Sequence, residues 1–151
     1  MAGTVAAGAR TGAISGATPD VEPCPCGRLD ARQRPLLLAQ CCGLWRNGDT
    51  PAPDAESLMR SRYTAYVRGD AAYLRATWHP RTCPADVTPD RATRWLGLSV
   101  REHRVLDADH AEVEFVARCR PAGPGPAGRL QERSRFVREG GRWYYVDGDQ
   151  R

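Results

Sequence analysis

The chain has 151 residues, of which 41% are hydrophobic and 26% charged, and its formal net charge is +4. This length suits one ordinary domain with a small appendage, and the composition is typical of a soluble globular protein rather than a disordered one. No segment approaches the ~20 consecutive apolar residues that a membrane-spanning helix needs, so we expect no membrane anchor.

The N-terminal residues 1–20 are mainly small, and glycines interrupt the apolar ones. A secretory signal needs an unbroken apolar region of ~7–15 residues behind basic ones, and this stretch contains none. We therefore expect residues 1–22 to form a flexible tail and the protein to be cytoplasmic.

The next segment, residues 23–49, contains four of the six cysteines. Cys24 and Cys26 are separated by one residue, fourteen residues follow, and Cys41 and Cys42 are adjacent. Paired cysteines in the reducing cytosol are more often metal ligands than disulfides, and four thiolates from two close pairs suit tetrahedral zinc. So short a segment, with few large apolar side chains, also needs metal binding in order to fold. The spacing predicts one structural Zn²⁺ bound by these four cysteines.

Two other interpretations of these cysteines remain open, namely a redox dithiol and a disulfide between the adjacent Cys41 and Cys42. Redox pairs are usually spaced as Cys-x-x-Cys, which favours zinc here. The two remaining cysteines, Cys83 and Cys119, stand alone in the sequence, and we interpret both as ordinary thiols that are buried or half-buried.

A helix is predicted after the proline-rich residues 50–53, with Asp54 as its N-cap and Gly69 as its C-terminal stop. Between them, apolar residues recur at the 3.6-residue period and form one stripe: Leu58, Met59, Tyr63, Tyr66 and Val67. Three arginines are expected to lie mostly off that stripe: Arg60, Arg62 and Arg68. A second, shorter helix should run from Asp70 to about residue 77, because the His79-Pro80 step disfavours helical backbone.

After an irregular stretch over residues 81–94, the hydrophobic period changes to two. The first strand begins at Trp95, with Leu96, Leu98 and Val100 on one face, and a turn follows at residues 107–109. Three further strands are predicted, with a loop at 121–128 and a hairpin turn at 139–141 between them: 113–117, 130–138 and 143–146. Helices followed by an antiparallel meander predict an α+β fold.

The cysteine pattern resembles the SEC-C motif, a zinc knuckle also found at the C-terminus of the SecA translocation ATPase. Together with it, further motifs resemble the uncharacterised bacterial YchJ family over about residues 22–149. The segments that carry this resemblance are 24–27, 41–43, 55–66, 77–80, 95–98, 132–136 and 141–148.

This resemblance implies that Cys24, Cys26, Cys41 and Cys42 are the zinc ligands. It also implies that residues 50–151 form a nuclear-transport-factor-2-like (NTF2-like) cone, with helices packed in a curved antiparallel sheet. The family usually has eight residues between the cysteine pairs, where this chain has fourteen.

The concave face of such a cone often holds a ligand, and seven residues are expected to line it: Tyr63, Tyr66, Trp78, His79, Glu132, Trp143 and Tyr145. His79 and Glu132 would make an acid–base pair if they converged. Alternatively, the aromatic residues belong to the core, His79 is a helix-end residue, and Glu132 makes cross-strand ion pairs on a polar face. No phosphate-binding loop, G-x-S-x-G or H-E-x-x-H motif is present, so we assign no catalytic residue.

Three functions are compatible with the sequence. The first is a non-enzymatic module whose zinc knuckle docks a protein partner, and the second is binding or conversion of a small molecule in the cone. The third is nucleic-acid binding through strand arginines: Arg118, Arg120, Arg129, Arg133, Arg135 and Arg138. The third is the least favoured, because acidic residues interleave with these arginines. Moreover, all 22 basic residues are arginine, which is typical of GC-rich codon usage.

Overall fold

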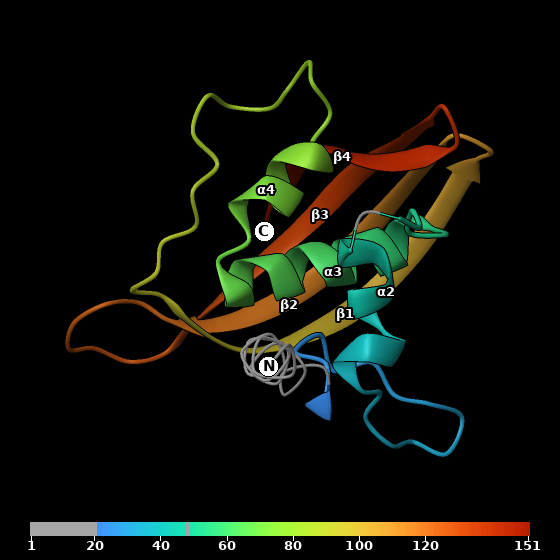
Figure 1. Cartoon of the computed structure of the whole chain (residues 1–151). Coiled ribbons are helices and arrows are strands. Elements are labelled where there is room, and N and C mark those ends of the chain that lie inside the picture. The colour runs from blue at the N-terminus through green and yellow to red at the C-terminus, as the bar shows by residue number, and fades with distance from the viewer. Residues whose placement is uncertain (1–20, 48) are drawn as a thin grey trace, which may run out of the picture.

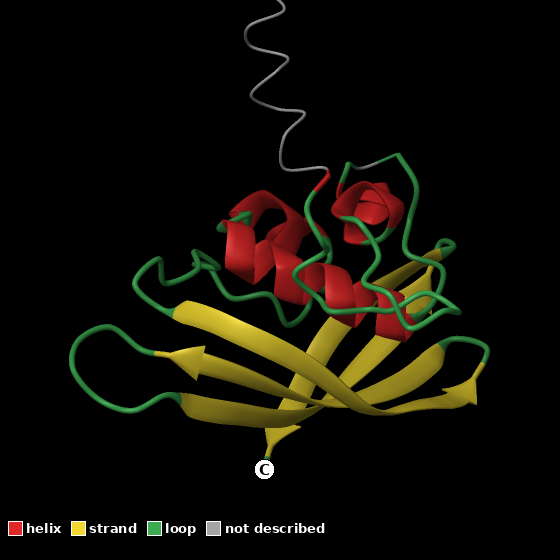
Figure 2. Cartoon of the chain, turned by 90° about the horizontal axis from the view of Figure 1, so that it is seen from below, coloured by secondary structure: helices red, strands yellow, loops and turns green. Residues whose placement is uncertain are grey.

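A four-stranded antiparallel sheet forms one layer of the protein, and the helices form a second layer on one of its faces (Figure 1, Figure 2). The structure, a computed structural model, describes residues 21–47 and 49–151. The strands lie in the order β1-β2-β3-β4, so each strand pairs with its neighbour in the chain. The predicted α+β fold, with helices before an antiparallel meander, is confirmed.

The expected tail lies outside the described residues, apart from Val21 and Glu22. In the part of the chain that is described, no helix is both long enough and apolar enough to cross a membrane.

The cysteine-rich segment is built from short elements rather than long ones. Two isolated antiparallel bridges close the loop between the cysteine pairs: Pro23 with Leu37, and Leu29 with Pro35. A 3₁₀ turn, η2 (Leu38–Gln40), and a short helix, α2 (Cys42–Arg46), carry the chain through the second cysteine pair. This segment packs against the next helix.

The two predicted helices are present, with the expected ends. Helix α3 (Ala55–Arg68) begins at Asp54, whose carboxylate accepts a hydrogen bond from a backbone N–H of the first turn at 2.7 Å. It ends at Gly69, whose φ of 70° is a left-handed conformation that glycine adopts without steric cost. Helix α4 (Ala71–Ala76) begins at Asp70, whose carboxylate caps it in the same way.

The predicted apolar stripe of α3 was wrong at two positions. Arg62 is only 5% exposed, whereas Val67 is 36% exposed. Arg62 lies four residues from both Leu58 and Tyr66, so it falls on the buried line of the helix. Val67 follows Leu58 by two and a half turns and therefore lies on the opposite side.

The four predicted strands are confirmed, and they are longer than their apolar cores suggested: β1 (Arg94–Asp107), β2 (His110–Arg120), β3 (Gly128–Glu139) and β4 (Arg142–Gln150). On β2, Val113, Phe115 and Ala117 face the helices and are buried, as their alternation predicted.

One feature of β1 differs from the prediction. The register with β2 shifts between Trp95 and Gly97, so β1 carries a bulge there. Because a bulge adds one residue, Trp95 and Leu98 both pack against the core, while Leu96 is 39% exposed. The expected alignment of Leu96 with Leu98 was therefore wrong.

The segment after α4 joins the free edge of β4. The N–H of Tyr145 donates to the carbonyl of Thr77, and the N–H of His79 donates to the carbonyl of Tyr145, both at 2.8 Å. Trp78 thus forms a parallel bridge with Tyr145. Since successive residues of extended chain point to opposite sides, this pairing separates the side chains of Trp78 and His79.

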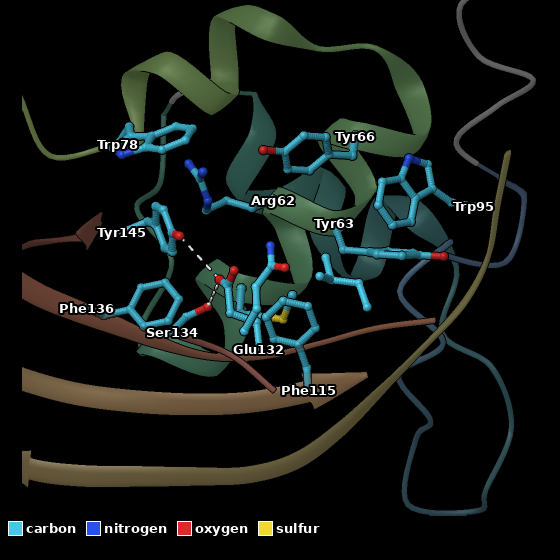
Figure 3. A pocket seen from close by; sticks show the side chains of 13 residues that line it. Arg62, Tyr63, Tyr66, Trp78, Trp95, Phe115, Glu132, Ser134, Phe136 and Tyr145 are labelled. Carbon is cyan, nitrogen blue, oxygen red and sulfur yellow. Dashed lines mark hydrogen bonds between the residues drawn. The ribbon is translucent and has the colours of Figure 1, made fainter. Parts of the chain in front are cut away.

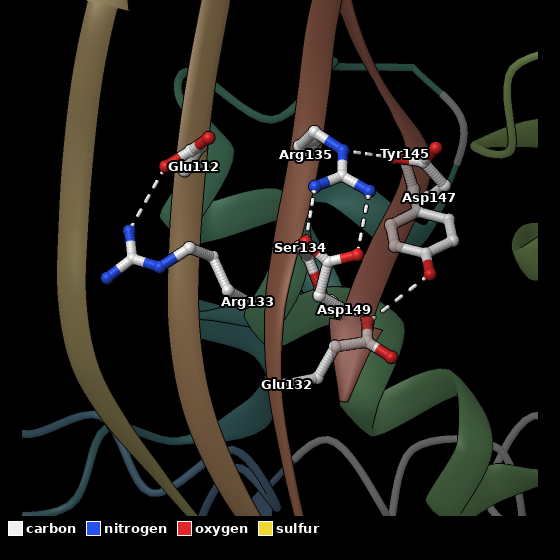
Figure 4. Close-up of polar contacts among 8 residues, drawn as sticks. All are labelled: Glu112, Glu132, Arg133, Ser134, Arg135, Tyr145, Asp147 and Asp149. Carbon is white, nitrogen blue, oxygen red and sulfur yellow. Dashed lines mark hydrogen bonds and ion pairs between the residues drawn. The ribbon is translucent and has the colours of Figure 1, made fainter. Parts of the chain in front are cut away.

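The face of β3 that points away from the helices carries ion pairs (Figure 4). Arg133 lies within 3.1 Å of three carboxylates: Glu102, Glu112 and Glu114. Arg135 contacts two more: Asp147 and Asp149. These pairs neutralise two of the six arginines that the nucleic-acid hypothesis requires.

The buried core is continuous from the cysteine-rich segment to the far strands. One cluster of contacting buried residues contains all four cysteines of residues 23–49, together with Leu58 and Tyr63 of α3, Phe115 of β2 and Phe136 of β3. The cysteines are therefore packed into the main core.

Candidate metal centre and cavity

The four cysteines of the N-terminal segment converge on one point beside α3. Their Sγ atoms all lie within 4.8 Å of one another, and each residue is at most 5% exposed. The Sγ atoms of Cys26 and Cys41 are 3.5 Å apart, far longer than a disulfide bond of ~2.05 Å. All four are free thiols, so the predicted clustering is confirmed and the disulfide alternative is not observed among them.

The chemistry of this cluster fits a soft divalent cation. Four sulfurs around zinc at ~2.3 Å lie ~3.8 Å apart, which is compatible with the observed spacing. Hydrogen bonds with Cys26, Cys41 and Cys42 hold the pKa of the Cys24 thiol well below its ordinary value. The hydrogen bonds that Cys41 and Cys42 make with the Cys24 thiol in turn raise the pKa of both residues. Four thiols of this kind do not all ionise together unless a cation compensates their charge.

Contacts with α3 hold the cluster in place. The Sγ of Cys24 lies 3.7 Å from the hydroxyl of Thr64, and Nη1 of Arg60 donates to the carbonyl of Cys26 at 3.0 Å. Arg60 is itself oriented by Glu56, with Nε to carboxylate at 2.9 Å. A zinc ion with four thiolates would carry a net charge of about −2, and Arg60, although paired with Glu56, would offset part of it.

A cavity of about 310 Å³ lies between α3 and the inner face of the sheet (Figure 3). Most of its walls are aromatic: the ring of Trp95 lies 5.8 Å from that of Tyr63 and 5.9 Å from that of Tyr66, centroid to centroid. Of the seven predicted pocket residues, five line this cavity: Tyr63, Tyr66, Trp78, Glu132 and Tyr145.

Arg62 carries a buried positive charge into the cavity (Figure 3). Its Nη1 donates to the carbonyl of Leu74 at 2.9 Å and to the hydroxyl of Thr77 at 2.8 Å. The guanidinium carbon lies 5.0 Å from the ring centroid of Trp78 and 4.6 Å from that of Tyr145. Within residues 21–47 and 49–151, no carboxylate oxygen lies within 4.0 Å of this guanidinium. Burial lowers the pKa of Arg62.

Glu132 lies on the opposite wall of the cavity, on the inner face of β3. Its Oε1 accepts hydrogen bonds from the hydroxyls of Ser134 at 2.6 Å and Tyr145 at 3.2 Å. The interpretation of Glu132 as a polar-face ion-pair residue was therefore wrong. Residues 132, 134 and 136 all line the cavity, so in β3 the even-numbered residues face inward. Gly148 provides the space for this carboxylate, because a Cβ there would lie 2.5 Å from Oε1.

The other two predicted pocket residues lie elsewhere. His79 accepts a hydrogen bond at Nδ1 from the N–H of Arg81, so its Nε2 carries the proton and donates to Glu139 at 3.1 Å. Trp143 lines a separate cavity with Leu58 and Tyr73. The structure thus gives His79 and Glu132 different partners and does not join them as an acid–base pair.

Sequence reasoning did not identify Arg62 as a cavity residue. The signal that could have found it is its four-residue spacing from Leu58 and from Tyr66, which places all three on one helix face. An arginine on an apolar stripe, rather than beside it, is a candidate for a buried functional charge.

Comparison with known proteins decides the family. A family model described as YchJ, middle NTF2-like domain, matches residues 54–148. The chain belongs to the YchJ family. A UPF0225 protein of Polaromonas sp. (strain JS666) is 63% identical over 130 residues, with 85% of this chain and 93% of the relative covered. Another, from Cupriavidus pinatubonensis, is 58% identical over 133 residues and covers 84% of this chain and 87% of its own.

Two solved structures are similar to this YchJ-family chain. The solution structure of a SEC-C motif containing protein from Rhodopseudomonas palustris matches with a TM-score of 0.73 and 32% identity, covering 85% of this chain and 98% of that one. The crystal structure of a SEC-C motif containing protein from Psychrobacter arcticus matches with a TM-score of 0.67 and 32% identity, covering 85% and 82%. The predicted resemblance to SEC-C and YchJ proteins is confirmed.

Proposed function

We propose that Cys24, Cys26, Cys41 and Cys42 bind one structural Zn²⁺ and that the chain is a non-catalytic interaction module built around it. The observation that carries the metal proposal is the convergence of four buried, free thiols within 4.8 Å. Four cysteine ligands close the coordination of zinc, whereas a catalytic zinc keeps one position open for water or substrate. The ion would supply folding free energy to a segment that lacks a core of its own.

The test is metal analysis of purified protein, for which we expect about one zinc per chain. Cys42→Ser should lower this content strongly, since Cys42 is 1% exposed inside the cluster. Cys83→Ser is the matched control, because Cys83 is half-buried and lies outside the cluster. Metal-free protein with four readily titrated thiols in this segment would refute the proposal.

The proposed partner is a protein that contacts the exposed surface around the zinc ligands. This is supported by two large apolar side chains on the cysteine-rich segment, Leu29 at 46% and Leu44 at 42% exposure. A partner that covers these side chains removes their apolar surface from water, which favours association. The similarity to SEC-C motif containing proteins supports the proposed docking of a protein partner, by analogy of motif alone.

Affinity capture with the full chain tests this second step. A double variant, Leu29→Ser with Leu44→Ser, should retain zinc and lose the captured partner. Leu106→Ser is the control, since Leu106 is a comparably exposed leucine (50%) at the far end of β1. If the double variant captures the same proteins as the wild type, this surface is not the docking site.

A further inference from the structure

Arg62 poses a problem that the zinc proposal leaves unexplained. A buried cation is normally paired with a carboxylate, because burial removes the water that stabilises its charge. Arg62 is 5% exposed, and in the described residues only neutral oxygens accept its hydrogen bonds. Aromatic faces of Trp78 and Tyr145 compensate part of the charge but supply no anion.

We infer that the cavity binds a small aromatic carboxylic acid, with its carboxylate on Arg62 and a hydroxyl or amino donor directed at Glu132. The inference goes beyond the zinc site, since none of the four clustered cysteines lines the cavity. It assigns binding, and no reaction.

The hydrogen-bonding pattern of Arg62 selects the anion. Both of its protein hydrogen bonds leave from Nη1, so within the described part of the chain Nε and Nη2 donate to no acceptor. These two nitrogens form one edge of the guanidinium, and that edge matches the two oxygens of a carboxylate as a bidentate fork. The protein therefore fixes the guanidinium by one nitrogen and leaves the fork free to bind.

The walls of the cavity select the body of the ligand. Seven of the thirteen residues that line the cavity are aromatic, and among them the rings of Tyr63, Tyr66 and Trp95 stand edge to face or tilted toward one another. Flat apolar surfaces at such angles accommodate an aromatic ring by stacking and edge contacts. A volume of about 310 Å³ is at the lower end of small-molecule sites, so a ligand of one or two rings is favoured over a nucleotide or another large ligand.

Glu132 restricts both the charge and the polarity of the ligand. Its Oε1 already accepts two hydrogen bonds, whereas Oε2 accepts none from the described residues. A ligand hydroxyl or amino group would satisfy Oε2. A dianion such as a phosphate monoester would place two negative charges in a cavity with one cation and one carboxylate, so a monoanion is favoured.

A hydrated cavity is the competing explanation. In that case water would bridge Arg62 and Glu132, and the two charges would compensate each other across the cavity without any ligand. The two explanations differ in one measurable respect, because a hydrated cavity gives no preference for an acid over its neutral alcohol.

The experiment is isothermal titration calorimetry on the full chain as purified, with the zinc content of every sample recorded. The probes are one-ring and two-ring hydroxyaryl and aminoaryl carboxylic acids, each beside the primary alcohol of the same skeleton. The leading pair is 4-hydroxyphenylacetate and 4-hydroxyphenethyl alcohol; phenylacetate lacks the donor, and phenyl phosphate carries the second charge. We expect the acid to bind about 10-fold more tightly than its alcohol, or about 1.4 kcal/mol.

Variants assign the preference to named groups. Arg62→Met should reduce the ratio of acid to alcohol affinity to about one, and Arg62→Lys should leave an intermediate ratio, because lysine keeps the charge without the fork. Glu132→Gln should raise that ratio and improve binding of phenyl phosphate, because it removes a negative charge that disfavours anions in the cavity. It should also narrow the difference between 4-hydroxyphenylacetate and phenylacetate. Arg68→Met is the control, since Arg68 lies on the same helix but pairs with Glu22 at the surface.

Three results would overturn the inference. They are the absence of binding by every acid at millimolar concentration, equal affinity of acids and alcohols for the wild type, and an unchanged preference in a folded Arg62→Met variant. The first two need no variant, so they remain decisive if Arg62→Met does not fold. If one of these results is obtained with protein of normal zinc content, the ligand inference fails and the proposed metal site stands. If the zinc content is low but the acid is still preferred over its alcohol, the metal proposal fails and the ligand inference stands.

Discussion

Removal of zinc is expected to destabilise the whole protein, and not the cysteine-rich segment alone. The reason is that the four ligands belong to the same buried cluster as Leu58 of α3 and Phe136 of β3. In addition, Thr64 and Arg60 of α3 contact the cluster directly. A metal that binds the folded state therefore adds its binding free energy to the stability of helix and sheet together.

The magnitude follows from this linkage. Free zinc at about 1,000 times its dissociation constant stabilises the folded state by about 4 kcal/mol. For a chain of this size, each kcal/mol shifts the melting temperature by about 2–4 °C, so depletion should lower it by about 8–16 °C. Scanning calorimetry in a series of zinc buffers measures the shift, which should grow steadily with the logarithm of free zinc.

Amide hydrogen exchange locates the effect. Zinc depletion should lower the protection of Val113 and Phe115, which are buried on β2 far from the cysteines in sequence. Cys83→Ser should leave both the zinc dependence and the exchange unchanged. If β2 keeps its protection while residues 23–49 lose theirs, the metal stabilises only a local unit and the argument from a shared core is wrong.

Three further outcomes follow from single side chains. Burial raises the pKa of Tyr63 from 10.0 to about 12, so its contribution to the free energy of unfolding is complete below pH 10 and declines as the pH rises toward 12. Urea unfolding at a series of alkaline pH values should therefore show a shallower loss of stability for Tyr63→Phe than for the wild type. Asp54→Ala removes the 2.7 Å cap of the Ser57 N–H and should cost about 1 kcal/mol in the same assay, whereas Asp54→Asn should cost less. Gly148→Ala should displace the Glu132 carboxylate, which calorimetry would register as a loss of preference for hydroxylated probes with the acid preference retained.

Most of the fold could be predicted because its signals are local. Capping residues and hydrophobic periods depend on neighbours within a few positions, and these gave α3, α4 and the four strands. The bulge at Trp95 could not be predicted, since one added residue exchanges the two faces of the strand, and the alternating pattern does not show where this happens. The clustering of the four cysteines was predicted from their spacing, whereas their packing against α3 depends on contacts between distant segments.

The cavity was predicted less completely, for the same reason. His79 and Glu132 were expected to form an acid–base pair only if they converged, and the bridge between Trp78 and Tyr145 instead directs Trp78 toward the cavity and His79 toward Glu139. This bridge joins residues 67 positions apart, and no local pattern encodes it. Arg62 was missed because a charged residue was assigned to the solvent face, although its position on the helix places it inside.

The cysteine cluster and the cavity share one structural element, so we expect the proposed metal site and the proposed ligand site to be coupled. Helix α3 contacts the cysteine cluster through Thr64 and lines the cavity with Met59, Arg62 and Tyr63. A helix released on one side is less well fixed on the other, so zinc depletion should weaken binding of 4-hydroxyphenylacetate even though no cluster cysteine lines the cavity.

Titrations with and without a chelator, at a temperature where the depleted protein is still folded by circular dichroism, measure this coupling. Thr64→Val, which keeps all four thiols but removes the hydroxyl at 3.7 Å from Cys24, should reproduce part of the loss. Equal affinities in the zinc-loaded and depleted proteins would mean that α3 is held by the sheet alone.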